Sequence, residues 1–139
     1  MDVNGIKCRY LCPSANTNFT KEPFVRIWSN ATQWPGGKLP ADGDNVTIPG
    51  PWTVLMDMNP AIINFWMIDG DVIIPPTLPI AYIVANSVWV RLGSIKAGTS
   101  TSPYPGDLTF EIRGNKSDAG YVINADVAGT KLFVITGVI

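Results

Sequence analysis

The stretches Ile62-Ile63-Asn64-Phe65-Trp66-Met67-Ile68 and Ile80-Ala81-Tyr82-Ile83-Val84-Ala85 decide the fold, because both are apolar on their two faces. A strand of that kind is buried between layers of a protein. The stretch Leu108-Thr109-Phe110-Glu111-Ile112-Arg113 instead alternates apolar and polar residues, as a half-buried strand does. Together the three stretches predict either a sandwich of sheets or a stacked solenoid.

The composition of the whole chain supports an all-β fold of short strands joined by Gly/Pro-rich turns. Val, Ile and Thr make up over a quarter of the residues, and 12 prolines interrupt the chain. One segment, Lys21 to Ser29, is also compatible with a short helical turn, and the sequence leaves that open. The predicted strands are Asn45 to Ile48, Trp52 to Asp57, Ile62 to Ile68, Asp71 to Ile74, Ala81 to Ala85, Ser87 to Leu92, Leu108 to Arg113, Tyr121 to Ile123 and Lys131 to Thr136.

The length of 139 residues is enough for one compact domain and too short for two independent cores. Residues 1–23 differ in composition from the rest and are predicted to form an N-terminal arm, with the β domain over residues 24–139. Cys8 and Cys12 lie in this arm. Their spacing fits neither a structural zinc site nor a Cys-x-x-Cys redox pair, so a local disulfide is expected.

The charge pattern excludes several classes of function. The chain has a net charge of −1, which is not the basic footprint that nucleic acid binding requires, and it contains no histidine to act as a base or metal ligand. Only 15% of the residues are charged, against about 25% in ordinary soluble domains. We therefore expect glycans, uncharged polar side chains or a partner to cover part of the surface.

Four Asn-x-Ser/Thr sequons indicate an extracellular, secreted glycoprotein. Their asparagines are Asn18, Asn30, Asn45 and Asn115. No stretch approaches the ~20 apolar residues of a membrane span. The first seven residues do not form a secretory signal, so either a signal has been removed or the chain is a segment.

Several blocks of sequence together resemble the G8 domain family. They are Trp28-Ser29-Asn30, Trp34-Pro35, Gly37-Lys38-Leu39-Pro40, Gly43-Asp44-Asn45-Val46-Thr47-Ile48-Pro49 and Thr53-Val54-Leu55-Met56-Asp57, and the resemblance covers about residues 24–139. Gly37, Gly43, Gly70, Gly93, Gly98 and Gly114 match the glycine pattern of that family. The resemblance implies a solenoid-like extracellular β module, as in polyductin-like and cell-surface hyaluronidase-like proteins, that contacts extracellular ligands, glycans among them.

Two acidic turns are the best candidates for site chemistry. Asp42-Gly43-Asp44 and Asp69-Gly70-Asp71 each place two carboxylates across a glycine, an arrangement that could bind calcium or act as an acid/base pair on a sugar. Asp before Gly is also an ordinary turn sequence, with the carboxylate bonded to nearby backbone. We favour turns, with Asp42, Asp44, Asp69 and Asp71 kept as weak calcium candidates and no catalytic residue assigned.

Aromatic side chains are candidates for stacking against sugar rings. Trp66 and Trp89 lie inside apolar strands and are expected to be buried. Trp52 and Tyr104 are flanked by Pro and Gly in loops, so they are the predicted ligand-binding residues. The polar loop 97–106 around Tyr104 is a candidate contact segment.

These observations favour an extracellular, glycosylated binding or structural module without catalysis or a cofactor. If the chain ends at Ile139, the apolar run from Lys131 lacks a following strand, and solenoids with uncovered ends tend to stack. We therefore predict self-association with other copies, with a head-to-tail filament as one form that it takes. The alternative is a non-catalytic fragment of a larger cell-surface carbohydrate-active, hyaluronidase-like enzyme.

Overall fold

The computed structural model describes residues 2–3, 6–7, 19–115, 121–123, 126–129 and 131–136. In this part of the chain the regular structure is β-strand apart from two short 3-10 turns, so the all-β prediction is confirmed. The elements are β1 (Asp2–Val3), β2 (Ile6–Lys7), β3 (Arg26–Ile27), η1 (Ala31–Gln33), η2 (Pro35–Gly37), β4 (Asn45–Ile48), β5 (Thr53–Leu55), β6 (Ile63–Ile68), β7 (Asp71–Ile74), β8 (Ile80–Val90), β9 (Ser94–Ala97), β10 (Asp107–Ile112), β11 (Tyr121–Ile123), β12 (Asp126–Gly129) and β13 (Leu132–Ile135).

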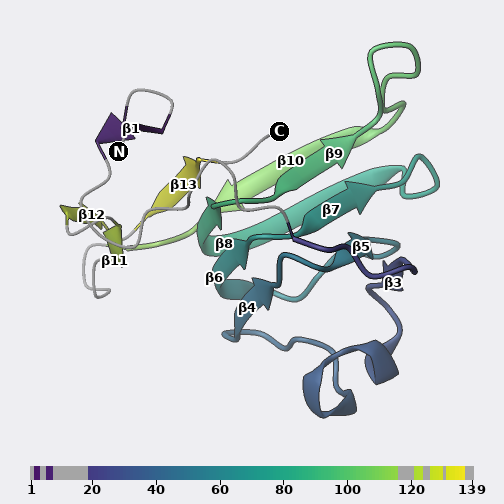
Figure 1. Cartoon of the computed structure of the whole chain (residues 1–139), viewed down its shortest axis with the longest axis horizontal. Coiled ribbons are helices and arrows are strands. Elements are labelled where there is room, and N and C mark those ends of the chain that lie inside the picture. Colours follow the sequence, from purple (N-terminus) through teal and green to yellow (C-terminus); the bar gives the residue numbers. More distant parts are fainter. Residues whose placement is uncertain are drawn as a thin grey trace.

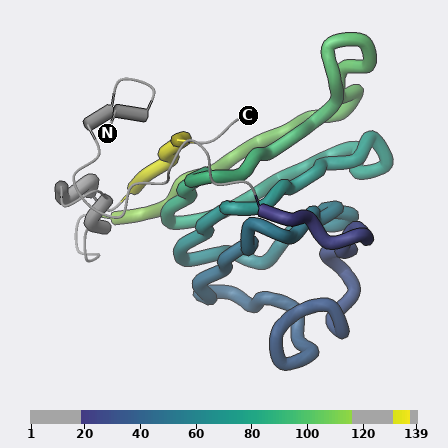
Figure 2. Tube along the Cα trace, in the orientation of Figure 1, coloured from purple at the N-terminus to yellow at the C-terminus, as the bar shows by residue number. Residues whose placement is uncertain are grey.

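Two parallel sheets build the body of the protein. The first has the order β10-β8-β6-β4, with β13 also paired to β8, and the second has the order β3-β5-β7-β9. Consecutive strands alternate between the sheets, so that β4 leads to β5, β6 to β7 and β8 to β9 (Figure 1). The chain therefore winds as successive coils that lie side by side (Figure 2). Of the two architectures left open by the sequence, the structure is the solenoid.

Strand β8 bends in its middle, so its two halves form two sides of one coil. Ala81, Ile83 and Ala85 are buried in its first half, whereas Val88 and Val90 are buried in its second half. The inward side of the strand thus changes from odd to even positions between the two halves. β10 pairs with the first half and β13 with the second half, so these two strands form the last described coil. The two predicted strands Ala81 to Ala85 and Ser87 to Leu92 are therefore one bent strand.

Stacked apolar side chains fill the interior of the solenoid. Ile48, Ile68 and Val90 occupy equivalent positions on β4, β6 and β8, and each is 0% exposed. In the second sheet, Val54 of β5 and Val72 of β7 stack in a similar column, which continues on β9. The end of the stretch Ile62 to Ile68 is therefore fully buried on one face only. Trp66 and Ile68 point inward, whereas Met67 is half-exposed.

Tryptophans close the N-terminal end of the solenoid. Trp28 and Trp34 are 1% and 8% exposed, and their rings meet edge to face with centroids 4.7 Å apart. Trp28 also meets Trp66 of β6 at 5.6 Å, and the Trp34 indole N–H donates to the Trp28 carbonyl at 2.9 Å. These contacts bury the interior side of the first coil, where among the described residues β4 has no strand beyond it in its sheet.

Glycine at two corners lets neighbouring coils approach each other. A Cβ at Gly93 would lie 1.8 Å from the Gly70 carbonyl oxygen, and a Cβ at Gly70 would lie 2.3 Å from the Pro49 carbonyl oxygen. No side chain fits at such distances, so the corners that follow β6 and β8 require glycine.

Some local predictions need correction. The sequence leaves a short helical turn open for the segment Lys21 to Ser29. The segment instead contains β3, because Arg26 and Ile27 pair with Val54 and Leu55 of β5. The predicted strands also do not include β1, β2, β9 and β12; β9 escapes the pattern because polar residues such as Lys96 interrupt it. Among the described residues, no helix is long and apolar enough to cross a membrane.

Candidate functional site

The C-terminal edge of the solenoid exposes residues that are buried in every earlier coil. Ile135 of β13 stands opposite Val90 and continues the column of Ile48, Ile68 and Val90, yet it is 40% exposed where the other three are 0% exposed. Leu108 of β10 stands opposite the fully buried Ala81 and is 37% exposed. The last described coil therefore lacks the cover that its predecessors have.

A groove runs along this edge between β9 and β10. It has a volume of about 550 Å³, and its apolar lining includes Ile95 and Ala97 of β9 together with Leu108 and Phe110 of β10. Among the described residues β9 pairs with β7 alone, so its other side is an unpaired strand edge. Unpaired edges beside an apolar groove are templates for the strand of a partner.

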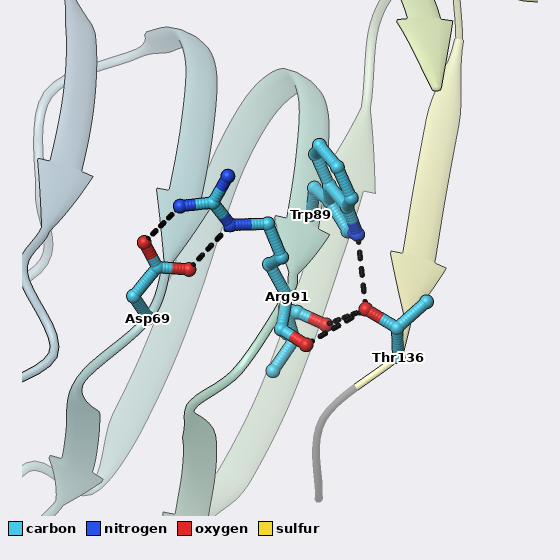
Figure 3. Close-up of polar contacts among 5 residues, drawn as sticks. Asp69, Trp89, Arg91 and Thr136 are labelled. Atoms are coloured by element: carbon cyan, nitrogen blue, oxygen red, sulfur yellow. Dashed lines mark hydrogen bonds and ion pairs between the residues drawn. The ribbon is translucent and has the colours of Figure 1, made fainter. Parts of the chain in front are cut away.

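Polar side chains link the corners of three successive coils on one side of this edge (Figure 3). The Arg91 Nε donates to Asp69 at 2.7 Å, and a second guanidinium nitrogen of Arg91 also pairs with the Asp69 carboxylate. The Trp89 indole N–H donates to the Thr136 hydroxyl at 3.2 Å, and that hydroxyl donates to the Arg91 carbonyl at 2.7 Å. The group holds the last coil against the two before it.

Side-chain contacts at the corners shift the pKa of two residues, Arg91 and Asp71. The hydrogen bond to Asp69 raises the pKa of Arg91 above its ordinary value, against a smaller opposing effect of burial. Burial alone would raise the pKa of Asp71, but the hydrogen bond from Ser94 and the hydrogen bond and charge of Lys21 outweigh it and hold that pKa below 3.8. The Lys21 ammonium lies 3.2 Å from the Asp71 carboxylate.

The acidic candidates of the first turn are bonded to backbone. The Asp44 carboxylate accepts from the N–H of Ala41 at 2.9 Å, and the Asp42 carboxylate accepts from the N–H of Ile62 at 2.8 Å. Across the described residues, no group of three or more acidic, Cys or His side chains gathers in a metal-binding arrangement. The structure therefore gives all four aspartates structural partners, and calcium binding stays a prediction.

The aromatic candidates are less exposed than expected. Trp52 is half-buried against the core, with the Arg26 guanidinium 3.9 Å from its ring centre. Tyr104 is also half-buried, and its hydroxyl donates to the Leu78 carbonyl. Trp66 is fully buried as expected, but Trp89 is only half-buried because it points outward from β8.

Three of the four sequon asparagines are described, and all three are exposed. Asn30 begins η1, Asn45 begins β4, and Asn115 follows β10. Asn18 and the two cysteines Cys8 and Cys12 lie outside the described residues.

Sequence reasoning missed a column of asparagines at the corner where β8 bends. The Asn86 side-chain N–H donates to Asn64 at 3.0 Å, and the Asn64 side-chain N–H donates to Asn45 at 2.8 Å. The three residues belong to three successive coils. The signal was present in the sequence, because these asparagines recur at the spacing of one coil.

Comparison with known proteins agrees with this architecture. Residues 33–139 match the G8 domain. The chain is 27% identical to fibrocystin from Canis lupus familiaris over 103 residues, and 28% identical to fibrocystin from Mus musculus over 93 residues. These matches cover 73% and 66% of this chain but 2% of each fibrocystin, and no solved structure matches significantly. Because the family match covers most of its length, the chain belongs to the G8 domain family, as its sequence blocks predict.

Proposed function

We propose that this chain is an extracellular, glycosylated contact module that associates with a second copy through its open C-terminal edge. Membership of the G8 family and the similarity to fibrocystin support the extracellular assignment. The matched segment is 2% of fibrocystin, so the activity of the larger relatives is not carried over. The role proposed here is that of the module alone.

The exposure of Ile135 carries the proposal. A position that is buried in three successive coils, as Ile48, Ile68 and Val90, and 40% exposed in the fourth, as Ile135, is a candidate contact surface. Leu108 and Phe110 extend this surface along the groove beside β9. Association that covers these side chains removes apolar area from water, at about 25 cal/mol per Å².

The two ends of the solenoid differ, which determines the kind of assembly. Head-to-tail growth into the filament that the sequence suggested needs an open surface at both ends. Among the described residues, Trp28 and Trp34 cover the interior at the N-terminal end, whereas Leu108 and Ile135 stay exposed at the C-terminal edge. Two copies that meet through their C-terminal edges bury both open surfaces at once, so we propose a closed dimer as the basic unit.

Catalysis receives no support from the acidic residues. Asp42 and Asp44 bind backbone N–H groups, Asp69 pairs with Arg91, and Asp71 pairs with Lys21. Carboxylates that are occupied in this way hold the fold together, and none is poised as an acid or base on a substrate. A hyaluronidase-like enzyme that contained this module would therefore take no catalytic carboxylate from these four residues.

An extracellular glycan is a second proposed ligand. Tyr104 and Lys96 line an apolar hollow of about 360 Å³ between the β9–β10 loop and the end of β7. An apolar wall with an aromatic ring beside a cationic side chain suits an acidic sugar.

Light scattering on the secreted chain tests the association. We expect a dimer at micromolar concentration and a monomer for Ile135→Lys, which places a charge on the open edge. Met58→Lys is the matched control, because Met58 is 39% exposed and lies away from that edge. A monomeric wild-type chain, or an Ile135→Lys variant that stays dimeric, contradicts the proposal.

A further inference from the structure

The asparagine column has a direction along the solenoid. Asn86 donates from its amide nitrogen to the amide oxygen of Asn64, and Asn64 donates in the same way to Asn45. The amide nitrogens of Asn86 and Asn64 therefore face the preceding coil, and the amide oxygens of Asn64 and Asn45 face the following coil. Asn45 belongs to the first of these coils: its amide oxygen accepts from Asn64, so its amide nitrogen is the arm that Asn64 does not hold.

Strand β4 is the outermost strand at that end of its sheet. Among the described residues it pairs with β6 alone, and both Asn45 and Thr47 are exposed on it. An unpaired edge of this kind invites the strand of another molecule. The tryptophans that close the interior do not pair with this edge.

A shallow groove of about 240 Å³ lies next to the β4 edge. Trp34, Leu39 and Pro40 provide its apolar wall, and Asn45 is part of its lining. The groove is smaller than the roughly 300–1,000 Å³ of ordinary ligand pockets. Its size and its apolar wall suit a single sugar ring, which packs its own apolar face on such side chains.

Asn45 is also the acceptor of the sequon Asn45-Val46-Thr47. A sugar joins asparagine at the amide nitrogen and leaves the amide oxygen unchanged. The hydrogen bond from Asn64 to the Asn45 oxygen is therefore compatible with glycosylation of Asn45. With its oxygen held by Asn64, Asn45 keeps its amide nitrogen for the sugar, next to the groove that Asn45 itself lines.

We propose that a glycan on Asn45 seats its first sugar in this groove, covers the edge of β4, and so confines self-association to the C-terminal edge. The inference rests on the proposed function, because it needs a secreted chain whose C-terminal edges meet. The glycan makes the assembly finite: with both the interior and the β4 edge covered at the N-terminal end, growth stops at two copies.

The other described sequons provide internal controls. The Asn30 side-chain oxygen accepts from the N–H of Thr32 at 3.2 Å and from its hydroxyl at 2.7 Å, which fixes it at the start of η1. Asn30 and Asn115 are exposed and do not line the groove beside β4. Sugars on these two residues have no pocket to enter there.

The first experiment measures protection of the sugar. The chain secreted from a eukaryotic host is treated with peptide N-glycosidase under native conditions, and each site is followed by peptide mass spectrometry. We expect removal at Asn45 to be roughly tenfold slower than at Asn30 and Asn115, which corresponds to about 1.4 kcal/mol of protection. Equal rates, or a bare Asn45 beside occupied Asn30 and Asn115, overturn the inference alone. A chain with no sugar at any sequon overturns the proposed glycoprotein as well.

The second experiment measures assembly. Thr47→Ala removes the sequon but keeps Asn45 and its bond with Asn64, and Thr32→Ala removes the sequon of Asn30 in the same way. By light scattering we expect assemblies larger than two copies for Thr47→Ala and wild-type dimers for Thr32→Ala. A Thr47→Ala variant that stays dimeric, although Asn45 is glycosylated in the wild-type chain, overturns the inference. Matching urea midpoints for the two variants show that both are folded.

Discussion

Replacing Gly93 by alanine tests the close stacking of the coils. The new Cβ would stand 1.8 Å from the Gly70 carbonyl oxygen and 2.7 Å from the carbonyl carbon of Asp69. These are backbone atoms of the preceding coil, so no side-chain rotation relieves the clash. The oxygen must retreat by about 1.6 Å to reach the ordinary contact distance of 3.4 Å.

The cost of this change has two parts. Overpacking a well-packed region costs about 1–3 kcal/mol, and the upper value applies because backbone has to move. The Gly70 oxygen also accepts a hydrogen bond from the Ser94 N–H at 3.0 Å, whose loss adds about 1 kcal/mol. We expect Gly93→Ala to lower the free energy of unfolding by about 4 kcal/mol.

Urea unfolding followed by tryptophan fluorescence measures this loss. Gly36→Ala is the control, because a Cβ there meets nothing within 4 Å and only the φ of +73° is strained, at about 1–2 kcal/mol. Gly50→Ala should lie between the two, since the three atoms nearest its Cβ all belong to the Phe19 side chain and not to backbone, and it keeps the test valid if Gly93→Ala does not fold. A Gly93→Ala variant as stable as Gly36→Ala would show that the coils do not approach each other closely at Gly93.

Three further predictions follow from the polar contacts. Asp69→Asn breaks the charged hydrogen bonds to Arg91 and should lower the free energy of unfolding by about 1.5–3 kcal/mol in urea; an unchanged midpoint contradicts the role given to this pair. The pKa of Asp71 is lower in the folded state than its ordinary value of 3.8, so this residue stabilises the fold above pH 3.8 and loses that effect as pH falls through the folded-state pKa. Asp71→Asn should therefore flatten the acid side of the curve of unfolding free energy against pH. An acid profile identical to that of the wild type counts against this. Tyr104→Phe loses the bond to the Leu78 carbonyl and should cost about 1 kcal/mol, while a neutral result would leave the β9–β10 loop held by packing alone.

The strands could be predicted from the sequence where their pattern is local. Asn45 to Ile48 and Asp71 to Ile74 match β4 and β7 at both ends, because buried residues alternate with exposed ones in β4 and with half-buried ones in β7. The bend of β8 at Asn86 could not be predicted, since it depends on which halves pair with β10 and β13. A pairing between residues 45 positions apart, such as Val90 with Ile135, has no local signature.

The candidate site likewise has features with a local sequence signal and features that depend on distant contacts. The sequons follow from the local sequence, and the exposure of Asn30, Asn45 and Asn115 agrees with it. The need for glycine at position 93 instead comes from the Gly70 carbonyl of the preceding coil. The half-burial of Trp52 depends on Arg26, which reaches it from another strand. The open C-terminal edge appears only when Ile135 is compared with its partners in earlier coils.

The intact mass of the secreted chain, before and after enzymatic removal of N-linked sugars, tests the central claim most directly. An extracellular glycoprotein module predicts a mass well above the 15.0 kDa of the polypeptide, falling to that value after the treatment. A chain that reaches the medium at 15.0 kDa and does not change on treatment would contradict it.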